Sequence, residues 1–492
     1  MAEAAKTAKN AKTAITPTRE ENFPEWYQQV VRAADMAENS PVRGCYTLKP
    51  YGFAVWENVQ KHLGQMIKDE DVENAYFPLL IPLSYIAKEA EHIDGFAKEC
   101  AVVTHHRLAV NDEGQLAPHP ESQLTEPLVI RPTSETIIGE SMHNWVQSYR
   151  DLPLKLNQWC NVMRWEMRPR IFLRTAEFLW QEGHNAFATA EEADADARRM
   201  LEVYRTFLED YMAVPGFAGV KTPEERFPGA IETYTIEAFM QDGKALQACT
   251  SHNLGQTFAK SSDIKFLDRD GVQKLAWTTS WGMSTRTVGG LIMVHGDDDG
   301  MIMPPKIAPY QVAILPFLKG DDDQAAIFAY CEEVKAKLRT QGISARIDTS
   351  DARSSDKMWA VIKKGVPVRL EIGAREISEG KLTIVRRDLG KDGKVQVAAD
   401  DIAAAVQSAL DTMQKDMLAR ARQRLQGMVT DVNTVAELRA FFADGKAAGG
   451  VRLDYSLVKD SAEYQAVAGE FSLTARCLPF DAPGKVIIAK AY

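Results

Sequence analysis

The chain reads RWE at 164–166, FLRTAEF at 172–178 and STRTVGG at 284–290, and each of these segments contains one arginine. Phosphate is the natural partner of such a side chain, because the planar, permanently charged guanidinium presents five donors that match phosphate oxygens. Taken singly, an arginine is more often a solvated or ion-paired surface residue. The surroundings of these three therefore decide whether they form a phosphate site.

Alternation of apolar and polar residues predicts a strand over Leu154–Glu166, with Arg164 and Glu166 on one face. An unpaired charge in such an aromatic stretch would be costly. The turn at 168–170 predicts a hairpin that returns Arg174 beside Arg164. Phe178 follows on the second strand, where an aromatic ring could stack on a purine. The chain has neither a GxxxxGK[ST] loop nor a strand-linked GxGxxG turn, so arginines would have to hold any nucleotide.

Composition indicates an ordinary globular protein of 492 residues, enough for about three domains. The net charge of −10 argues against a protein coated for non-specific nucleic-acid binding, but leaves room for one specific RNA held by a local basic surface. No apolar run reaches the roughly 20 residues that span a bilayer. The six cysteines are scattered without a CxxC pair, and residues 1–19 lack the apolar stretch of a secretory signal. We predict a disordered tail at 1–19 and a cytoplasmic location.

The pattern divides the remainder into three parts: a mixed domain at 20–305, an α/β unit at 306–410 and a small domain at 411–492. Spacing of apolar residues predicts a helix at Pro50–Lys68, and Thr189 with Glu192 forms a capping box that starts another. Further expected elements are strands at Ala245–Thr250, Gly290–His295, Gln311–Leu318, Ser344–Ile347, Val368–Ile372 and Leu382–Arg386, and a helix at Asp323–Gln341.

Longer stretches carry a family resemblance. RWE with FLRTAEFLWQEGH resembles motif 2 of class II aminoacyl-tRNA synthetases, STRTVGGLIMVHGD resembles motif 3, and VENAYFPLLIPLSY resembles the proline-bearing motif 1. HIDGFAKECAVVTH, IRPTSET, LPLKLNQWCNVMRWE, CTSHNLGQTFAKS and TSWGMSTRT are similar to prolyl-tRNA synthetases of the archaeal/eukaryotic type. The resemblance extends from about residue 20 to Tyr492. It implies an α+β catalytic domain, with the class II antiparallel sheet flanked by helices, an α/β anticodon-binding domain and a small α+β C-terminal domain.

The resemblance also implies an activity and its residues. A proline–tRNA ligase joins L-proline to ATP, giving prolyl-adenylate and pyrophosphate, and transfers the prolyl group to tRNA(Pro), with Mg²⁺ and without a covalent enzyme intermediate. Arg164 and Arg286 would be catalytic, with Arg164 on the α-phosphate near the substrate carboxylate. The implied ATP-binding residues are Arg164, Glu166, Arg174, Thr175, Phe178, Gln247, Thr250, Ser284 and Arg286. The implied proline-binding residues are Thr133, Glu135, Arg164, Trp180, His184, His252 and Gly282.

Other implications concern partners and metals. Motif 1 forms the dimer interface in this class, so a homodimer is expected. Lys357, Arg369 and Glu371 are candidate readers of anticodon bases, although charged strands are often ordinary surface. Many prolyl enzymes of this type carry a four-cysteine zinc site in the last domain, where only Cys477 remains here. One cysteine cannot form a tetrahedral structural site, so we expect no zinc and expect residues 476–480 to pack as core. The interval from Arg174 to Arg286 leaves no room for an inserted editing domain.

Three alternatives stay open at this point. The chain could activate another amino acid, such as threonine or histidine, although the TxE loop at 133–135 and the SHNLGQ segment at 251–256 favour proline. It could be a synthetase-like binding protein without catalysis, although such relatives usually lose a triphosphate arginine. Within the pocket, Trp180 could be a core residue and His252 could cap the turn at 253–255.

Overall fold

The computed structural model describes residues 14–90, 99–320, 323–443, 445 and 448–492. The predicted disordered tail lies outside the described residues as far as position 13, but its end at 14–19 is ordered. Ile15 is 2% exposed and belongs to the main core, and helix α2 (Arg19–Ala33) starts at the Thr18 capping box. The prediction of disorder as far as residue 19 is therefore wrong, because the apolar side chain of Ile15 is buried by the rest of the protein.

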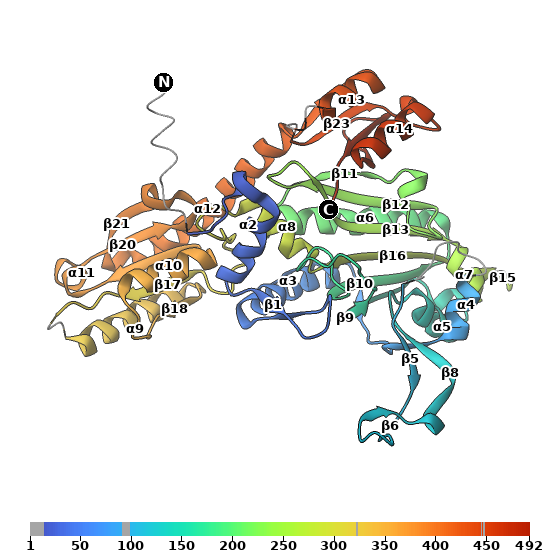
Figure 1. The fold of residues 1–492 in the computed structure, drawn as a ribbon, viewed down its shortest axis with the longest axis horizontal. Helices are drawn as coiled ribbons and strands as arrows, with labels where there is room; N and C mark the ends of the chain where they lie inside the picture. Colours follow the sequence, from blue (N-terminus) through green and yellow to red (C-terminus); the bar gives the residue numbers. More distant parts are fainter. Residues whose placement is uncertain (1–13, 91–98, 321–322, 444, 446–447) are drawn as a thin grey trace.

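A continuous sheet of eleven strands forms the centre of the molecule (Figure 1). Six of its strands pair antiparallel in the order β11-β12-β13-β16-β10-β9, and the short β3 adds to β9 in parallel. Their bounds are β3 (Glu73–Asn74), β9 (Leu154–Met163), β10 (Glu177–Phe187), β11 (Phe217–Val220), β12 (Glu232–Phe239), β13 (Ala245–Gly255) and β16 (Trp277–Ser284). The expected hairpin of β9 and β10 is confirmed, and so is an antiparallel central sheet.

Helix α6 (Ala190–Asp210) lies along one face of this sheet, against β12, β13, β16 and β10. The expected capping box at its start is confirmed, and Ala193, Ala197, Met200 and Tyr204 form its buried stripe. Helix α3 (Pro50–Lys68) has the predicted bounds and packs against α6. Because side chains alternate along a strand, the residues that do not face α6 point to the opposite face of the sheet.

The segment Gly290–His295 is a helix and not the strand that we expected. It forms the second half of α8 (Arg286–His295), which packs on β13 and β16. A short apolar run does not distinguish a strand from a helix that is buried on all sides. Close packing of this helix requires a glycine at position 289, because a Cβ there would lie 2.7 Å from Leu173 Cδ2 and 2.8 Å from the Tyr27 hydroxyl.

Smaller elements surround the sheet. The proline-bearing strand β4 (Leu80–Pro82) pairs with β8 (Gln123–Ile130) at the edge of a three-stranded sheet, whose third strand is β5 (Val102–His105). Figure 1 shows this sheet extending away from the main body into the hairpin of β6 and β7. The other elements of this part are β1 (Ala37–Asn39), β2 (Tyr46–Leu48), α4 (Leu83–Ala90), β6 (Leu108–Val110), β7 (Leu116–Pro118), α5 (Glu135–Trp145), α7 (Thr257–Ser261), β14 (Lys265–Leu267) and β15 (Gln273–Leu275).

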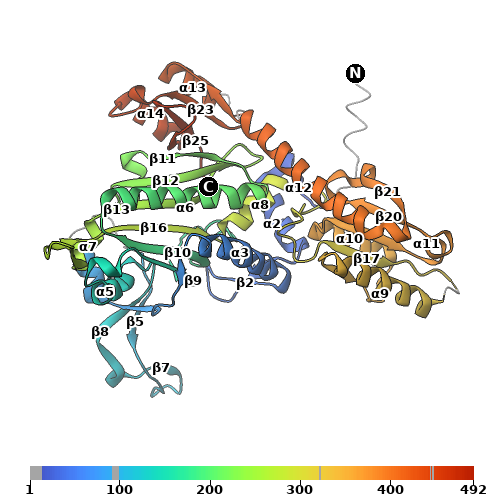
Figure 2. The same ribbon diagram turned by 180° about the vertical axis from the view of Figure 1, so that it is seen from behind.

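A separate five-stranded sheet, with its own apolar core, lies at one end of the molecule (Figures 1 and 2). Its strand order is β18-β17-β19-β20-β21, with β17 parallel to both neighbours and the other pairs antiparallel. The bounds are β17 (Val312–Pro316), α9 (Gln324–Thr340), β18 (Ala345–Ile347), α10 (Ser354–Lys364), β19 (Val368–Ile372), α11 (Ala374–Glu379), β20 (Lys381–Arg386) and β21 (Lys394–Ala398). The predicted elements of this unit match these to within a few residues.

Helix α12 (Ile402–Gln426) crosses the boundary that we predicted between residues 410 and 411. Its first turns, with Ile402, Val406 and Leu410, belong to the core of the five-stranded unit. Its next turns, with Met413 and Met417, pack with Ala213, which follows α6. One continuous helix thus connects two cores. The composition does not change near residue 410, so the sequence gives no sign of this connection.

The C-terminal unit extends the central sheet. Its strands continue the order as β22-β23-β25-β24, and β24 pairs with β11. The bounds are β22 (Val429–Asp431), α13 (Val435–Ala443), β23 (Gly450–Asp454), α14 (Ala462–Phe471), β24 (Thr474–Pro479) and β25 (Lys485–Ala489). Residues 476–480 are not plain core as expected. Cys477 is buried, but Phe480 is 45% exposed and Arg476 forms a buried ion pair with Glu237 of β12.

Candidate active site

A cavity of about 320 Å³ opens on the face of the central sheet opposite α6. On the α6 face, the Gln181 amide and the Tyr204 hydroxyl share a hydrogen bond, and the Ser251 hydroxyl donates one to the carbonyl of Ala197. Residues displaced by one position therefore face the cavity. Most of the predicted site residues line it, namely Thr133, Glu135, Arg164, Phe178, Trp180, His184, Gln247, Thr250, His252, Gly282, Ser284 and Arg286. Strand register brings them together, because Trp180 pairs with Ser284, and both Glu182 and Thr250 lie opposite Gly282.

Arg164 projects into the cavity just beyond the end of β9. Its amide donates to the carbonyl of Ala176 at 2.7 Å, which closes the predicted hairpin, and its Nε donates to the carbonyl of Pro132 at 2.9 Å. The guanidinium carbon lies 5.5 Å from the ring centroid of Phe178 and 5.4 Å from that of Trp180. Burial lowers the pKa of Arg164, and the carboxylates of Glu135 and Glu182 oppose this effect. The two rings and the carbonyl fix a cation at the middle of the cavity.

Arg286 is the first residue of α8 and also lines the cavity. Its Nε donates to the carbonyl of Leu173 at 3.1 Å. Burial, together with the charges of Arg164 and Arg174, lowers the pKa of Arg286 to about 10. Among the described residues, neither Arg164 nor Arg286 forms a salt bridge with a carboxylate. The cavity therefore holds positive charge that an anionic ligand would stabilise.

Three residues predicted for ATP binding lie off the cavity wall. Arg174 is exposed in the loop between β9 and β10, near enough to Arg286 to affect its pKa. Glu166 accepts a hydrogen bond from the amide of Arg168 at 2.7 Å. Thr175 lines a neighbouring cavity of about 230 Å³, which shares the Phe178 side chain with the first.

The opposite end of the cavity carries a buried acidic network. The Thr133 hydroxyl donates to the Glu135 carboxylate. Glu182, 2% exposed, accepts hydrogen bonds from Ser134, from Gln158 at 3.0 Å and from His184 at 2.9 Å. Burial is the largest single influence on both members of this last pair and disfavours their charges, but hydrogen bonds and opposite charges together outweigh it, so the pKa of Glu182 is lowered and that of His184 is raised. A negative pocket thus lies beside a cationic channel.

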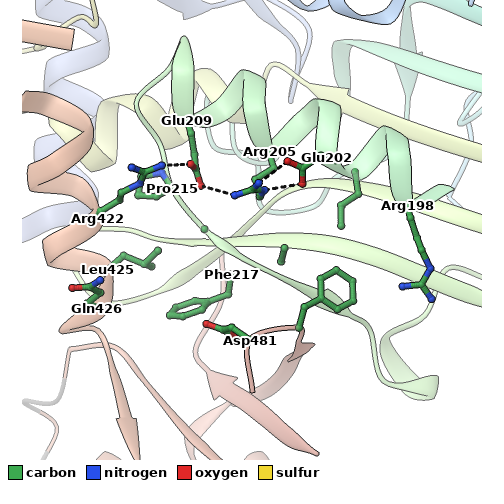
Figure 3. Close-up of a pocket in the computed structure, with 14 residues that line it drawn as sticks. Arg198, Glu202, Arg205, Glu209, Pro215, Phe217, Arg422, Leu425, Gln426 and Asp481 are labelled. Atoms are coloured by element: carbon green, nitrogen blue, oxygen red, sulfur yellow. Dashed lines mark hydrogen bonds and ion pairs between the residues drawn. The ribbon is translucent and has the colours of Figure 1, made fainter. Parts of the chain in front are cut away.

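A larger cavity of about 600 Å³ lies elsewhere, between α6, β11, the end of α12 and the loop at 480–481 (Figure 3). None of the predicted site residues lines it. Its arginines are already paired, because Arg205 contacts Glu202 and Glu209, and Arg422 contacts Glu209. Size alone therefore does not mark the functional site, whereas arginines without carboxylate partners do.

Comparison with known proteins assigns a family to this arrangement. Residues 119–295 match the family "tRNA synthetase class II core domain (G, H, P, S and T)", and residues 311–409 match "Anticodon binding domain". A proline–tRNA ligase of Bdellovibrio bacteriovorus is 51% identical over 96% of this chain and 95% of that protein. One of Rhodopirellula baltica is also 51% identical, over 96% and 94%. The chain belongs to the proline–tRNA ligase family.

Structure comparison agrees with this membership. The crystal structure of prolyl-tRNA synthetase from Cryptosporidium parvum, complexed with halofuginone and AMPPNP, matches with a TM-score of 0.89 at 33% identity, over 97% of this chain and 99% of that one. As a proline–tRNA ligase, the chain is a class II aminoacyl-tRNA synthetase with a catalytic core followed by an anticodon-binding domain. The five-stranded unit is that domain, as the resemblance implied.

Sequence reasoning missed two parts of the site. Glu182 lies two residues from Trp180 and from His184 on β10, so strand alternation could have placed it on the same face. The loop at 225–228 also lines the cavity, and its Phe227 ring stacks on His252 at a centroid distance of 4.5 Å. No signal in the sequence could have identified this loop, because the long β11–β12 connection returns it to the site.

The two pocket residues with open alternatives line the cavity. Trp180 is half-buried on its wall. His252 shares a hydrogen bond with Thr233 at 3.0 Å, while the turn at 253–255 is capped by the side chain of Asn253 instead. Burial and the charges of His184 and Arg164 lower the pKa of His252 to about 3, so this imidazole is neutral at ordinary pH.

The anticodon candidates lie in the five-stranded unit. Arg369 donates to Glu371 at 2.9 Å along one face of β19. Lys357 on α10 is only 5% exposed and its ammonium donates to the carbonyl of Asp348 at 3.3 Å. The structure therefore presents Arg369 and Glu371 as a half-buried pair and turns Lys357 inward.

The described residues contain no group of three or more His, Cys, Asp or Glu side chains placed to hold a metal ion. Cys45, Cys160, Cys249, Cys331 and Cys477 form no disulfide, and Cys477 is buried in β24. No helix within the described part of the chain is long and apolar enough to cross a membrane.

Proposed function

We propose that the cavity activates L-proline with ATP and transfers the product to tRNA(Pro). One observation carries this proposal: Arg164 and Arg286 reach the same cavity, both held by backbone carbonyls rather than by carboxylates. Such a site suits a polyanion, and the acidic pocket of Glu135 and Glu182 beside it suits a charged amine. A nucleoside triphosphate would suit the cationic part of the cavity, and the charged amine of an amino acid would suit its acidic part.

In this proposal ATP lies along the cationic wall. Arg164 contacts the α-phosphate, and Arg286 and Arg174 contact the γ-phosphate side, so that the triphosphate is bent. Adenine stacks on Phe178, with Glu166 and Thr175 nearby, as the resemblance implies. Gln247, Thr250 and Ser284 complete the ATP site. Support comes from the position of Phe178, whose ring is shared between the main cavity and its neighbour.

Proline occupies the acidic end. The imino group approaches Thr133 and Glu135, and the substrate carboxylate approaches Arg164. Trp180, His184, His252 and Gly282 surround the pyrrolidine ring, and we add Glu182, which holds His184 in place. A Cβ at Gly282 would lie 3.3 Å from the Trp180 ring, so the glycine preserves room for a small ring. His252 is neutral, so it lines this part of the cavity without adding a positive charge to that of His184.

The chemistry needs positioning and charge neutralisation rather than a protein nucleophile. An oxygen of the proline carboxylate attacks the α-phosphorus, the bond to the bridging oxygen breaks, and pyrophosphate leaves with the electron pair. A hydroxyl of the tRNA 3′-terminal ribose then attacks the prolyl carbonyl, and AMP leaves. Arg164 and Arg286 stabilise the charge that develops on the phosphoryl oxygens.

Mg²⁺ fits this site only as an ion brought by the nucleotide. The described residues offer no preformed cluster of metal ligands, and Mg²⁺ commonly binds through substrate phosphates with one or two carboxylates. When bound, it would supply additional positive charge to the triphosphate. We assign no protein ligand and expect no zinc in the C-terminal unit.

We propose a homodimer through the motif 1 region, a cytoplasmic location, and anticodon contacts at Arg369 and Glu371, with Lys357 requiring rearrangement to take part. We also propose the archaeal/eukaryotic subtype, supported by the interval between Arg174 and Arg286, which the strands and helices of the central sheet fill without an inserted domain.

Amino-acid-dependent ATP–pyrophosphate exchange tests the proposed function. We expect exchange with proline but not with threonine or histidine, and a loss of at least roughly 10²-fold in Arg164→Ala, because a charged donor to the reacting phosphate is removed. Arg205→Ala, in the larger cavity, is the matched control and should exchange as wild type does. Exchange that depends on threonine, or a folded wild type without exchange, would contradict the proposal.

A further inference from the structure

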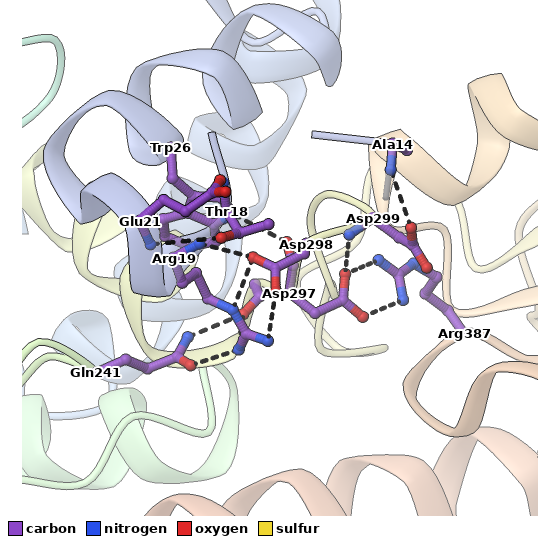
Figure 4. Close-up of polar contacts among 11 residues, drawn as sticks. Ala14, Thr18, Arg19, Glu21, Trp26, Gln241, Asp297, Asp298, Asp299 and Arg387 are labelled. Atoms are coloured by element: carbon purple, nitrogen blue, oxygen red, sulfur yellow. Dashed lines mark hydrogen bonds and ion pairs between the residues drawn. The ribbon is translucent and has the colours of Figure 1, made fainter. Parts of the chain in front are cut away.

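The turn that follows α8 is a meeting point of three parts of the chain (Figure 4). Asp297, Asp298 and Asp299 follow one another there, and each carboxylate has a different partner. Asp298 accepts from the amide and guanidinium of Arg19, at 2.8 Å and 3.2 Å, and Asp299 accepts from the amide of Ala14 at 3.2 Å. These two contacts hold the N-terminal segment, whereas Asp297 contacts Arg387.

Asp297 binds the anticodon-binding domain through a bidentate ion pair. Arg387 donates from Nη1 to one carboxylate oxygen of Asp297 at 2.8 Å and from Nη2 to the other at 2.6 Å. Its Nε donates to the carbonyl of Ile362 at 2.9 Å, so all three nitrogens of the guanidinium are used. Arg387 is only 7% exposed and follows β20 directly. Two parallel hydrogen bonds fix an orientation as well as a distance.

Backbone contacts beside this ion pair fit the two domains closely. The amides of Met301 and Met303 donate to the carbonyls of Lys363 and Gly365, each at 3.0 Å. Gly365 has a φ of +70°, and a Cβ there would lie 2.5 Å from the carbonyl carbon of Met301. The catalytic segment therefore lies against the end of α10 with no space for a side chain at this contact.

The catalytic side of the contact is itself fixed. The Trp26 indole donates to the carbonyl of Asp297 at 3.0 Å, and Asp297 and Gly300 exchange backbone hydrogen bonds across the turn. Helix α8 connects this turn to the cavity, because it begins at Arg286 and ends at His295. The contact with the anticodon-binding domain is therefore separated from Arg286 of the active site by one helix, α8, which is about 15 Å long.

We propose that Asp297 and Arg387 are positioning residues for the transfer to tRNA. The ion pair, which we call the interdomain latch, sets the position of the anticodon-binding domain relative to the cavity, so that a tRNA held at its anticodon presents its 3′ end to the adenylate. This inference rests on the proposed function. A small misplacement of a bound substrate can cost a large factor in rate, and the second contact of a two-site ligand depends on the geometry between the sites.

The test compares Asp297→Asn with Asp299→Asn, a matched control in the same turn. The asparagine keeps the size of the side chain and an oxygen for the turn amide of Asp299, but removes the charge that Arg387 binds. Arg387→Lys removes the fork and keeps the charge. Three activities are measured for each variant: proline-dependent exchange, charging of full-length tRNA(Pro), and charging of a minihelix that contains only the acceptor stem.

We expect Asp297→Asn and Arg387→Lys to lower kcat/KM for full-length tRNA about tenfold, with exchange and minihelix charging within twofold of wild type. Asp299→Asn should leave all three unchanged. Small-angle scattering of the substrate-free protein should show a larger radius of gyration for Asp297→Asn. Wild-type charging of full-length tRNA by both latch variants, an equal loss of all three activities, or unchanged scattering would overturn the latch. Failure of the proposed function would appear separately, as absent exchange in wild type.

Discussion

The arginines of the active-site cavity and the arginine at the junction with the C-terminal unit differ in what holds them. Arg164 and Arg286 donate to backbone carbonyls and have no carboxylate partner in the salt bridges of the described residues. At the junction, Arg476 and Lys221 both bind the fully buried Glu237, at 2.8 Å and 2.7 Å. A carbonyl positions an arginine without neutralising it, whereas a carboxylate neutralises it.

The two regions are also close enough to interact. The charge of Arg476 helps to lower the pKa of Arg286, whereas the charge of Glu237 acts to raise it. Burial alone would raise the pKa of Glu237, but the charges and hydrogen bonds of Lys221 and Arg476 together lower it, so the carboxylate stays ionised. The partner of a buried charge, and not the burial itself, therefore distinguishes an arginine that is available to a ligand from one that joins two parts of the fold.

The strongest challenge to this distinction is Arg286→Ala. We expect proline-dependent exchange to fall roughly 10²- to 10³-fold, because the charge on the triphosphate loses one of its cations. The urea midpoint of unfolding should change little, since the removed cation repels Arg164 and Arg174. A large loss of stability with normal exchange per folded molecule would show that Arg286 is structural, and the distinction would be wrong.

The junction should show the opposite behaviour. Glu237→Gln leaves two buried cations without their carboxylate, so we expect a loss of about 3–5 kcal/mol in the free energy of unfolding. Arg476→Met leaves Glu237 paired with Lys221, and should cost less, about 1–3 kcal/mol. Urea unfolding of both variants measures the difference. If the arginine variant is the less stable of the two, the paired arrangement at the junction is not what stabilises it.

His184 is an intermediate case, because it lies in the cavity and yet has a carboxylate partner. Its pKa is raised in the folded protein, so the stabilisation from its charge is fully present below the ordinary value of about 6.5 and is lost as pH rises through the raised value. We therefore expect His184→Gln to lower the free energy of unfolding more at pH 6 than at pH 9. Equal losses at both values would mean that Glu182 does not hold a charged imidazole.

The smallest effect should come from Gly282→Ala. The added Cβ would lie 3.3 Å from the Trp180 ring and from the carbonyl of Gln181, which requires a shift of a few tenths of an ångström. We expect a cost of about 1 kcal/mol, seen as a roughly fivefold higher KM for proline with the KM for ATP unchanged. Exchange kinetics with each substrate varied in turn measure both constants. A change confined to ATP would place this position in the other half of the site.

Part of this site could be predicted from the sequence because strands impose a period of two. Trp180 and His184 share a face of β10 for that reason, and the same period could have revealed Glu182. Helix α3 and the capping box at Thr189 depend on local spacing and local hydrogen bonds, so they were also predicted correctly. The segment Gly290–His295 was predicted wrongly, since a short apolar run has no period that distinguishes a buried helix from a strand.

The amino-acid sequence was sufficient to predict which residues of β10 share a face, because strand alternation is local. Its longer motifs implied the class II sheet through the family resemblance. Which partner each charge meets depends instead on the tertiary structure. Arg476 and Glu237 are 239 positions apart, and Arg387 and Asp297 are 90 apart. Pairing over such distances follows from how the domains pack. The structure is therefore needed to distinguish the arginines of the cavity, which have no carboxylate partner, from Arg476, which joins the C-terminal unit, and from Arg387 of the interdomain latch.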